Sequence, residues 1–117
     1  MALAFTVTLL GDHKGITRPK VVGDEYVVDA LVDVSSIVAA GSVIPASSFG
    51  LSTITAAVIT GHDNANGLQA QIECSATGAY ESESSIALMF TSLDGTNATL
   101  ADDGNGGSVR MRVYGNL

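Results

Sequence analysis

Residues 26–34 read YVVDALVDV, and this stretch indicates the fold because its apolar residues alternate. Successive side chains of a β-strand point to opposite faces, so alternation places one apolar set on a single face. That set is Tyr26, Val28, Ala30, Val32 and Val34. The other face carries Asp29 and Asp33 together with Val27 and Leu31. This mixed face predicts a second, weaker contact, such as a subunit interface.

Similar runs on both sides of this stretch predict further strands. They are rich in β-branched residues or alternate in polarity, and they cover residues 5–9, 20–23, 52–60, 68–75, 86–90 and 108–114. Within 52–60, Ile54, Ala56 and Val58 are expected to share one face. The nearly continuous apolar run at 86–90 predicts a central strand.

Turn residues separate these runs. Residues 44–51 suit one helical turn, with Pro45 at its first position and Gly50 closing it. Phe49 and Leu51 would then cover one end of the sheet. Asn66-Gly67 is a type I′ signal if a hairpin lies there.

About seven strands and one helical turn predict an all-β chain. The expected architecture is a single-domain antiparallel β-sandwich or small barrel, jelly-roll-like in type. One domain spans residues 1–117, with an N-terminal arm at 1–20 that could be extended. Hydrophobic residues make up 46% of the chain and charged residues 15%, which favours a packed core over disorder. The apolar content is mostly aliphatic, which suits flat interfaces, and we expect a homo-oligomer.

The chain is acidic, with a net charge of −7, and this argues against nucleic acid and anionic membranes as partners. Its five cations form two groups in the sequence. Lys14, Arg18 and Lys20 lie near the N-terminus, and Arg110 and Arg112 lie near the C-terminus. The first group could steer the protein onto an acidic surface, and the alternative is a solvated basic loop.

The sequence offers little for catalysis. Gly61-His62-Asp63 could hold a general base, but no G-x-S-x-G nucleophile motif accompanies it, and His beside Asp is common in turns. Cys74 is the single cysteine, so an intrachain disulfide and a thiolate-rich metal site are both excluded. We expect Cys74 to be buried on the apolar face of its strand. We therefore expect no enzyme and no cofactor.

Metal binding has two candidate sets. His13 and His62 are far apart in sequence, and the acidic residues near 94–105 lack the spacing of an EF-hand loop. These acidic and amide residues are Asp94, Asp102, Asp103 and Asn105. We expect no metal site. No run reaches the ~18 apolar residues of a membrane helix, and the N-terminus lacks a signal-like basic region, so we expect a protein made and used inside a cell.

Three segments together resemble small virion proteins of tailed bacteriophages. They are VDV at 32–34, Gly41 with Ile44 followed by SSFGLSTI at 47–54, and the closing strand VRMRVYG at 109–115. The chain is similar in these segments to head-decoration, or cement, proteins. The resemblance covers about half of the chain and rests on a pattern of strands rather than on reactive residues.

The resemblance implies a structural protein on the outer surface of an icosahedral capsid, assembled in the host cytoplasm. Its partners would be the major capsid protein and further copies of itself, as a trimer in preference to a dimer. On this reading Lys14, Arg18 and Lys20 contact the shell, and Val27 and Leu31 contact a neighbouring subunit.

Other classes remain open. A neck, tail or fibre-associated binding module is the main alternative, and nothing in the sequence separates it from a head protein. A carbohydrate-binding sandwich usually relies on exposed aromatics, but the chain has no Trp. A small hydrolase would require His62 to meet a nucleophile in space.

Overall fold

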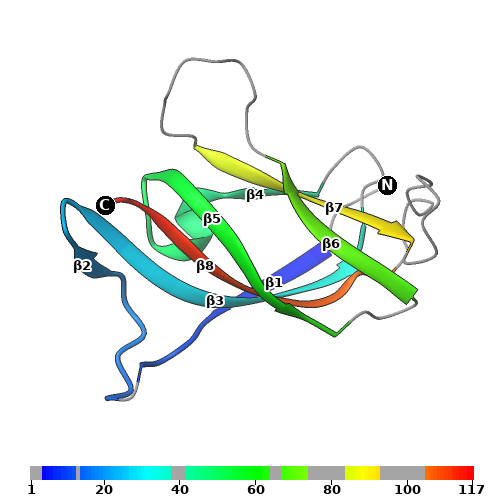
Figure 1. Ribbon diagram of the computed structural model, residues 1–117, viewed down its shortest axis with the longest axis horizontal. Helices are drawn as coiled ribbons and strands as arrows, with labels where there is room; N and C mark the ends of the chain where they lie inside the picture. The colour runs from blue at the N-terminus through cyan, green and yellow to red at the C-terminus, as the bar shows by residue number, and fades with distance from the viewer. Residues whose placement is uncertain (1–3, 13, 38–41, 64–66, 74–83, 93–104) are drawn as a thin grey trace.

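The structure is a computed structural model that describes residues 4–12, 14–37, 42–63, 67–73, 84–92 and 105–117. These residues form eight β-strands and one 3₁₀ turn, which is one strand more than the sequence suggested (Figure 1). The strands are β1 (Ala4–Leu9), β2 (Lys20–Val22), β3 (Glu25–Ser36), β4 (Ser42–Pro45), β5 (Thr53–His62), β6 (Leu68–Glu73), β7 (Ser85–Ser92) and β8 (Gly107–Asn116). The 3₁₀ turn η1 (Ala46–Phe49) follows β4.

The strands form two antiparallel sheets. The larger has the order β1-β3-β8-β5, with β2 also paired to β3, and the smaller has the order β4-β7-β6. Within the described residues no strand of one sheet pairs with a strand of the other, so the fold is a sandwich of two layers (Figure 1). The all-β prediction is confirmed, and the sandwich is selected over the barrel. β7 is the central strand of the smaller sheet, as its apolar run predicted.

The longest pairing joins β3 to β8 over nine residue pairs, from Tyr26 opposite Gly115 to Val34 opposite Gly107. The inward residues of the two strands face each other in this register, and each is at most 4% exposed: Val28 with Val113, Ala30 with Met111, and Val32 with Val109. The face predicted from the alternation in residues 26–34 is therefore the core face. Burying a side chain of valine size stabilises the fold by about 1.5–3 kcal/mol.

The smaller sheet and η1 supply the other half of the core. Their buried side chains are Ile44, Ala46, Phe49, Leu68, Ile86, Leu88 and Phe90. Pro45 has extended backbone and precedes η1, while Gly50 closes the turn at φ +78°, a value that favours glycine. Pro45 therefore caps the turn instead of occupying its first position. Phe49 and Leu51 are buried, as expected.

The N-terminal segment is part of the sheet and not a separate arm. β1 pairs with residues 30–36 of β3, and β2 pairs with residues 25–27. Tyr26 and Val27 also pair with β8, so β2 must lie on the same edge of β3 as β1. The chain leaves that edge at Leu10, whose N–H donates to the Asp29 carbonyl at 2.8 Å, and returns at Lys20. Residues 10–19 thus form a loop beside the sheet, the β1–β2 loop.

The prediction that Ile54, Ala56 and Val58 share the core face of β5 is correct for Ile54 and wrong for the two residues after it. Ile54 is buried, but Ala56 and Val58 are exposed, and Ala57 and Ile59 pack against the core instead. The cause is a bulge: Ile54 lies opposite Gly115 and Ala56 opposite Tyr114, which leaves Thr55 as an extra residue. The Thr55 hydroxyl donates to Glu25 at 2.8 Å. One extra residue inverts the alternation that follows it.

β5 and β6 belong to different sheets, so the segment between them connects the two layers and is not a two-residue hairpin. Gly67 does have positive φ, at +70°, whereas Asn66 lies outside the described residues. In β6, Leu68 is buried and Ala70 and Ile72 pack against the core, as predicted. The prediction for Cys74 falls outside the described residues.

Replacement of Gly115 by Ala tests the close approach of β8 to the β5 bulge. A Cβ at this position would lie 1.9 Å from the Thr53 carbonyl oxygen, a backbone atom that cannot move alone. We expect Gly115→Ala to lower the free energy of unfolding by about 3 kcal/mol.

Gly61→Ala is the matched control, since Gly61 also lies in the β5–β8 pair and a Cβ there would meet only the Arg110 Cβ at 3.8 Å. Its stability should be unchanged or raised by up to about 1 kcal/mol. Urea denaturation of both variants measures the difference, and equal stabilities would contradict the bulge geometry.

Candidate functional site

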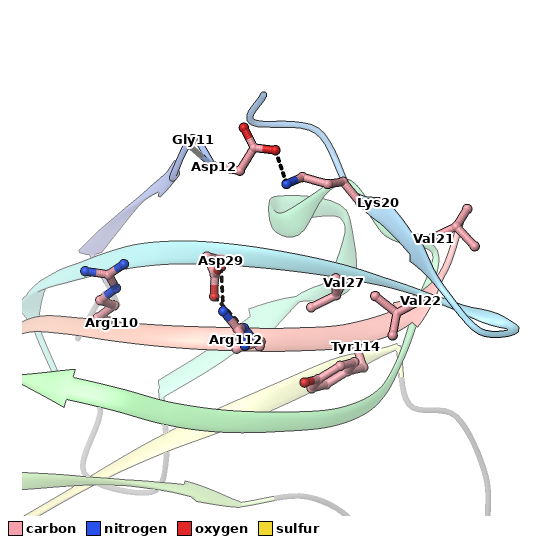
Figure 2. A pocket seen from close by; sticks show the side chains of 10 residues that line it. All are labelled: Gly11, Asp12, Lys20, Val21, Val22, Val27, Asp29, Arg110, Arg112 and Tyr114. Atoms are coloured by element: carbon pink, nitrogen blue, oxygen red, sulfur yellow. Dashed lines mark hydrogen bonds and ion pairs between the residues drawn. The ribbon is translucent and has the colours of Figure 1, made fainter. Parts of the chain in front are cut away.

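A groove of about 550 Å³ lies on the face of the five-stranded sheet that points away from the core (Figure 2). We call it the outer-face groove. β3 and β8 line its floor with Val27, Asp29, Arg110, Arg112 and Tyr114. The segment from the β1–β2 loop into β2 adds Asp12, Lys20, Val21 and Val22. The floor residues reach this face because they alternate with core residues along their strands.

Arg112 is fixed on the floor by its cross-strand partner. Its Nε donates to Asp29 Oδ1 at 2.9 Å and its Nη2 to Asp29 Oδ2 at 3.2 Å, a bidentate pair between directly opposed residues. The hydrogen bonds with Asp29 raise the pKa of Arg112 above its ordinary value. The two side chains are 50% and 31% exposed, so the pair stabilises the fold by less than about 1 kcal/mol. Its main effect is to orient the guanidinium.

Asp12 organises the β1–β2 loop. Its Oδ1 accepts hydrogen bonds from the backbone N–H groups of Lys14, at 2.8 Å, and Ile16, at 2.9 Å, while its Oδ2 accepts one from the Lys20 ammonium. These donors, Lys20 foremost, hold the pKa of the Asp12 carboxyl well below its usual range. The Asp12 and Lys20 side chains face each other above β3 in Figure 2. One carboxylate thus ties both ends of the loop to the rim of the groove.

Arg110 differs from the other cations of the groove. Among the described residues it has neither an ion-pair nor a hydrogen-bond partner, and it is exposed. Leu31 and Gly61 lie opposite it on the two neighbouring strands, so no carboxylate faces it directly. Asp33 is its diagonal neighbour on β3, and no ion pair joins the two side chains.

The fold brings three of the five basic residues into one groove. Lys20, Arg110 and Arg112 line the groove, and Lys14 and Arg18 are exposed on the β1–β2 loop. The groove itself holds three cations and two carboxylates, which leaves one positive charge on a chain of net charge −7. Lys20 meets the two arginines because β2 and β8 both pair with β3.

The structure unites some of the predicted site residues and separates others. Lys20 pairs directly with Val27 in the β2–β3 register, and both line the groove. Arg18 lines a small pocket of about 40 Å³ under the loop, where Lys20 and Val27 also contribute. Leu31 lies on the same outer face, opposite Arg110, but outside the groove. Lys20 of the predicted shell contact therefore shares one face with Val27 and Leu31 of the predicted subunit contact.

Sequence reasoning missed the floor of the groove. Arg110, Arg112 and Tyr114 alternate with Val109, Met111 and Val113 in the sequence, which places them on one face of a strand but does not show which strand lies beside them. The sequence placed Asp29 on the outer face but did not identify Arg112 as its partner. Their opposite charges were the only hint of the pairing, and this hint is weak because any sequence contains many such pairs of opposite charge.

His62 is engaged in packing. Its side chain is 6% exposed, its ring centroid lies 5.8 Å from that of Phe90, and its Nε2 lies 2.7 Å from the Gly106 carbonyl oxygen. A carbonyl only accepts, so Nε2 carries the proton and donates. Asp63 Oδ1 is 3.7 Å from the same nitrogen. This geometry ties the end of β5 to the residue before β8.

The metal candidates gain no support. Among the described residues no three His, Cys, Asp or Glu side chains cluster as a metal site would require. Asn105 accepts a hydrogen bond from the Gly107 N–H at 2.8 Å, which shapes the turn into β8. His13, Asp94, Asp102 and Asp103 lie outside the described residues. The described part of the chain also has no helix long and apolar enough to cross a membrane.

Searches of protein-family models, curated proteins and solved structures found no match to this chain.

Asp12→Asn tests the loop anchor. The substitution removes the negative charge that Lys20 binds and weakens acceptance from the Lys14 and Ile16 amides. We expect these amides to exchange with deuterium at least several-fold faster than in the wild type. Asp33→Asn, which removes an exposed carboxylate on the same face, should leave their exchange unchanged. Equal protection in the two variants would show that Asp12 does not hold the loop.

The pH dependence of the same anchor has a definite sign. An acid whose pKa is lower in the folded than in the unfolded protein stabilises the fold fully above its ordinary pKa of 3.8. That stabilisation is lost as the pH falls below this value toward the folded pKa. The stability difference between wild type and Asp12→Asn should therefore be largest above about pH 5 and shrink toward pH 2. Thermal unfolding across this range measures it, and a difference that grows in acid would contradict the assignment.

Proposed function

We propose that this chain is a structural protein of a tailed-phage particle, which binds the outer surface of the icosahedral capsid and clamps neighbouring major capsid subunits. The observation that carries the proposal is the groove that gathers Lys20, Arg110 and Arg112, beside the loop that carries the other two cations, Lys14 and Arg18, on a chain of net charge −7. A local group of cations on an acidic protein can orient it toward an acidic surface. The resemblance to decoration proteins supplies the partner.

The docking surface would be the outer-face groove together with Lys14 and Arg18 on the loop. Exposed charge pairs are individually weak, at about 0.2–1 kcal/mol each, so one copy would bind poorly. Several copies linked in an oligomer would bind much more tightly because the later contacts are intramolecular. A homotrimer remains our prediction. A subunit contact at Val27 and Leu31 would compete with shell binding, because both residues lie on the docking face.

The first test is the copy number and position of the chain in particles purified from its source phage, by gel densitometry and cryo-electron microscopy. Hundreds of copies at local three-fold or two-fold points would support the proposal and give the oligomer. A handful of copies at the neck, tail or fibres would replace it with the alternative role. Absence from particles would overturn both.

The second test concerns the cations of the loop. We expect Lys14→Ser with Arg18→Ser to reduce the fraction of occupied shell sites at least several-fold, with the loss growing at low salt, where electrostatic attraction is strongest. Lys20 is left in place because it anchors Asp12.

The matched control is Gln69→Glu with Gln71→Glu, which makes the same change in net charge at exposed positions on the smaller sheet. The control should occupy shells as the wild type does. Equal losses in the two double variants would mean that net charge, and not the docking face, governs binding.

A further inference from the structure

We propose that the outer-face groove is a binding site for an extended, acidic polypeptide segment, with a carboxylate of that segment held by Arg110. The proposal rests on the proposed function only for the identity of the partner, the capsid protein. The site itself is argued from the charges, pairings and exposure of the groove residues.

The cation available to bind an acidic ligand is identified by the ion pairs already present in the groove. Lys20 is bound by Asp12 and Arg112 by Asp29, each within the groove. Arg110 has no such partner among the described residues. A guanidinium offers a planar fork of N–H donors that matches the two oxygens of a carboxylate. Arg110 is therefore the one cation of the groove with its fork available to an incoming acid.

The neighbours of Arg110 leave room for this acid. Gly61 has no side chain, and even a Cβ there would meet only the Arg110 Cβ at 3.8 Å. Leu31, on the other side, is half-buried. A carboxylate can thus approach over the sheet surface without displacing an internal ion pair. The bidentate Asp29–Arg112 pair beside it is held in place and forms part of the groove floor.

The apolar part of the site lies further along the same strands. Val21 and Val22 are 65% and 50% exposed, and Val27 and Tyr114 are half-buried beside them. Figure 2 shows Arg110, Arg112 and Tyr114 in a row along β8, with the valines near the Tyr114 end. Alternate residues of a strand lie about 6.6 Å apart, so an extended segment along β8 would place an acid at Arg110 and an apolar residue at Val27 and Tyr114.

Size and charge favour a peptide segment over a nucleic acid. A groove of about 550 Å³ accommodates a few residues of extended chain. Nucleic-acid sites neutralise several phosphates with clustered cations, whereas this groove contains two carboxylates and one unpaired cation. The two groove carboxylates, Asp12 and Asp29, would repel the regularly spaced phosphates of a nucleic acid. A peptide segment can instead place its acidic side chain at Arg110 and uncharged side chains near these carboxylates.

The test uses the full chain and the fluorescein-labelled peptide ETVTVT, with QTVTVT as its uncharged counterpart. The acid and the two valines occupy alternate positions, so they lie on one face of the extended peptide. Fluorescence anisotropy should give a Kd below about 1 mM for ETVTVT and binding at least about tenfold weaker for QTVTVT. Amide shifts in the NMR spectrum should cluster at Val27, Asp29, Arg110 and Tyr114. The proposal would be overturned by an absence of saturable ETVTVT binding, by shifts confined to other surfaces, or by displacement of the peptide by a single-stranded oligonucleotide.

Variants distinguish the guanidinium fork of Arg110 from the effect of net charge. Arg110→Gln should weaken ETVTVT binding at least about tenfold, and Arg110→Lys should recover only part of it because an ammonium lacks the fork. Gln71→Glu makes the same change in net charge at an exposed position on the smaller sheet and should change binding less than about twofold. Asp33→Asn removes a carboxylate diagonal to Arg110 and should strengthen binding. Equal losses for Arg110→Gln and Gln71→Glu would overturn the site.

Failure of this proposal and failure of the proposed function are distinguishable. The peptide assay contains no particle, so peptide binding by a chain absent from particles would retain the groove and reject the capsid role. Conversely, a chain abundant on shells that shows no peptide binding would retain the capsid role and reject the groove. Thermal unfolding of each variant confirms that it folds, which is expected because Arg110, Gln71 and Asp33 are exposed.

Discussion

The antiparallel pairing of β3 with β8 is the constraint on which both faces of this protein depend. Its register places Val28, Ala30 and Val32 opposite apolar partners that fill the core. The same register places Asp29 opposite Arg112 on the other face. A shift of one residue would send the arginines of β8 toward the core, at a cost far above that of any surface contact. Packing on the inner face thereby fixes the chemistry of the outer face.

Local sequence patterns predicted much of the fold. The alternation in residues 26–34 identified the buried face of β3, and Pro45 and Gly50 marked a helical turn close to its true bounds. These features depend on neighbouring residues, which a sequence shows directly. The β5 face was missed because Thr55 is an extra residue in a bulge, and the bulge is set by the distant Gly115. The pairing of residues 4–9 with the edge of β3 could not be predicted, because the partner residues lie more than twenty positions away in the sequence.

The candidate site was predictable only in fragments. Lys20 and Val27 were each singled out, but their direct pairing and the arrival of Arg110 beside them depend on long-range strand order. The residues of the groove come from both ends of the chain, so no single segment carries a motif for it. What the sequence did show was an uneven charge distribution. The fold places Lys20 from one end of the chain and Arg110 and Arg112 from the other in one groove, on a protein of net charge −7.

The account depends most directly on the β3–β8 register, and the nuclear Overhauser effects between the two backbones measure it. Directly opposed residues of antiparallel strands give a short contact between either their amide or their α protons. We predict such contacts between Asp29 and Arg112 and between Leu31 and Arg110. Contacts of Ala30 with Arg112, or no contacts between the two strands, would contradict the register and with it the core and the groove.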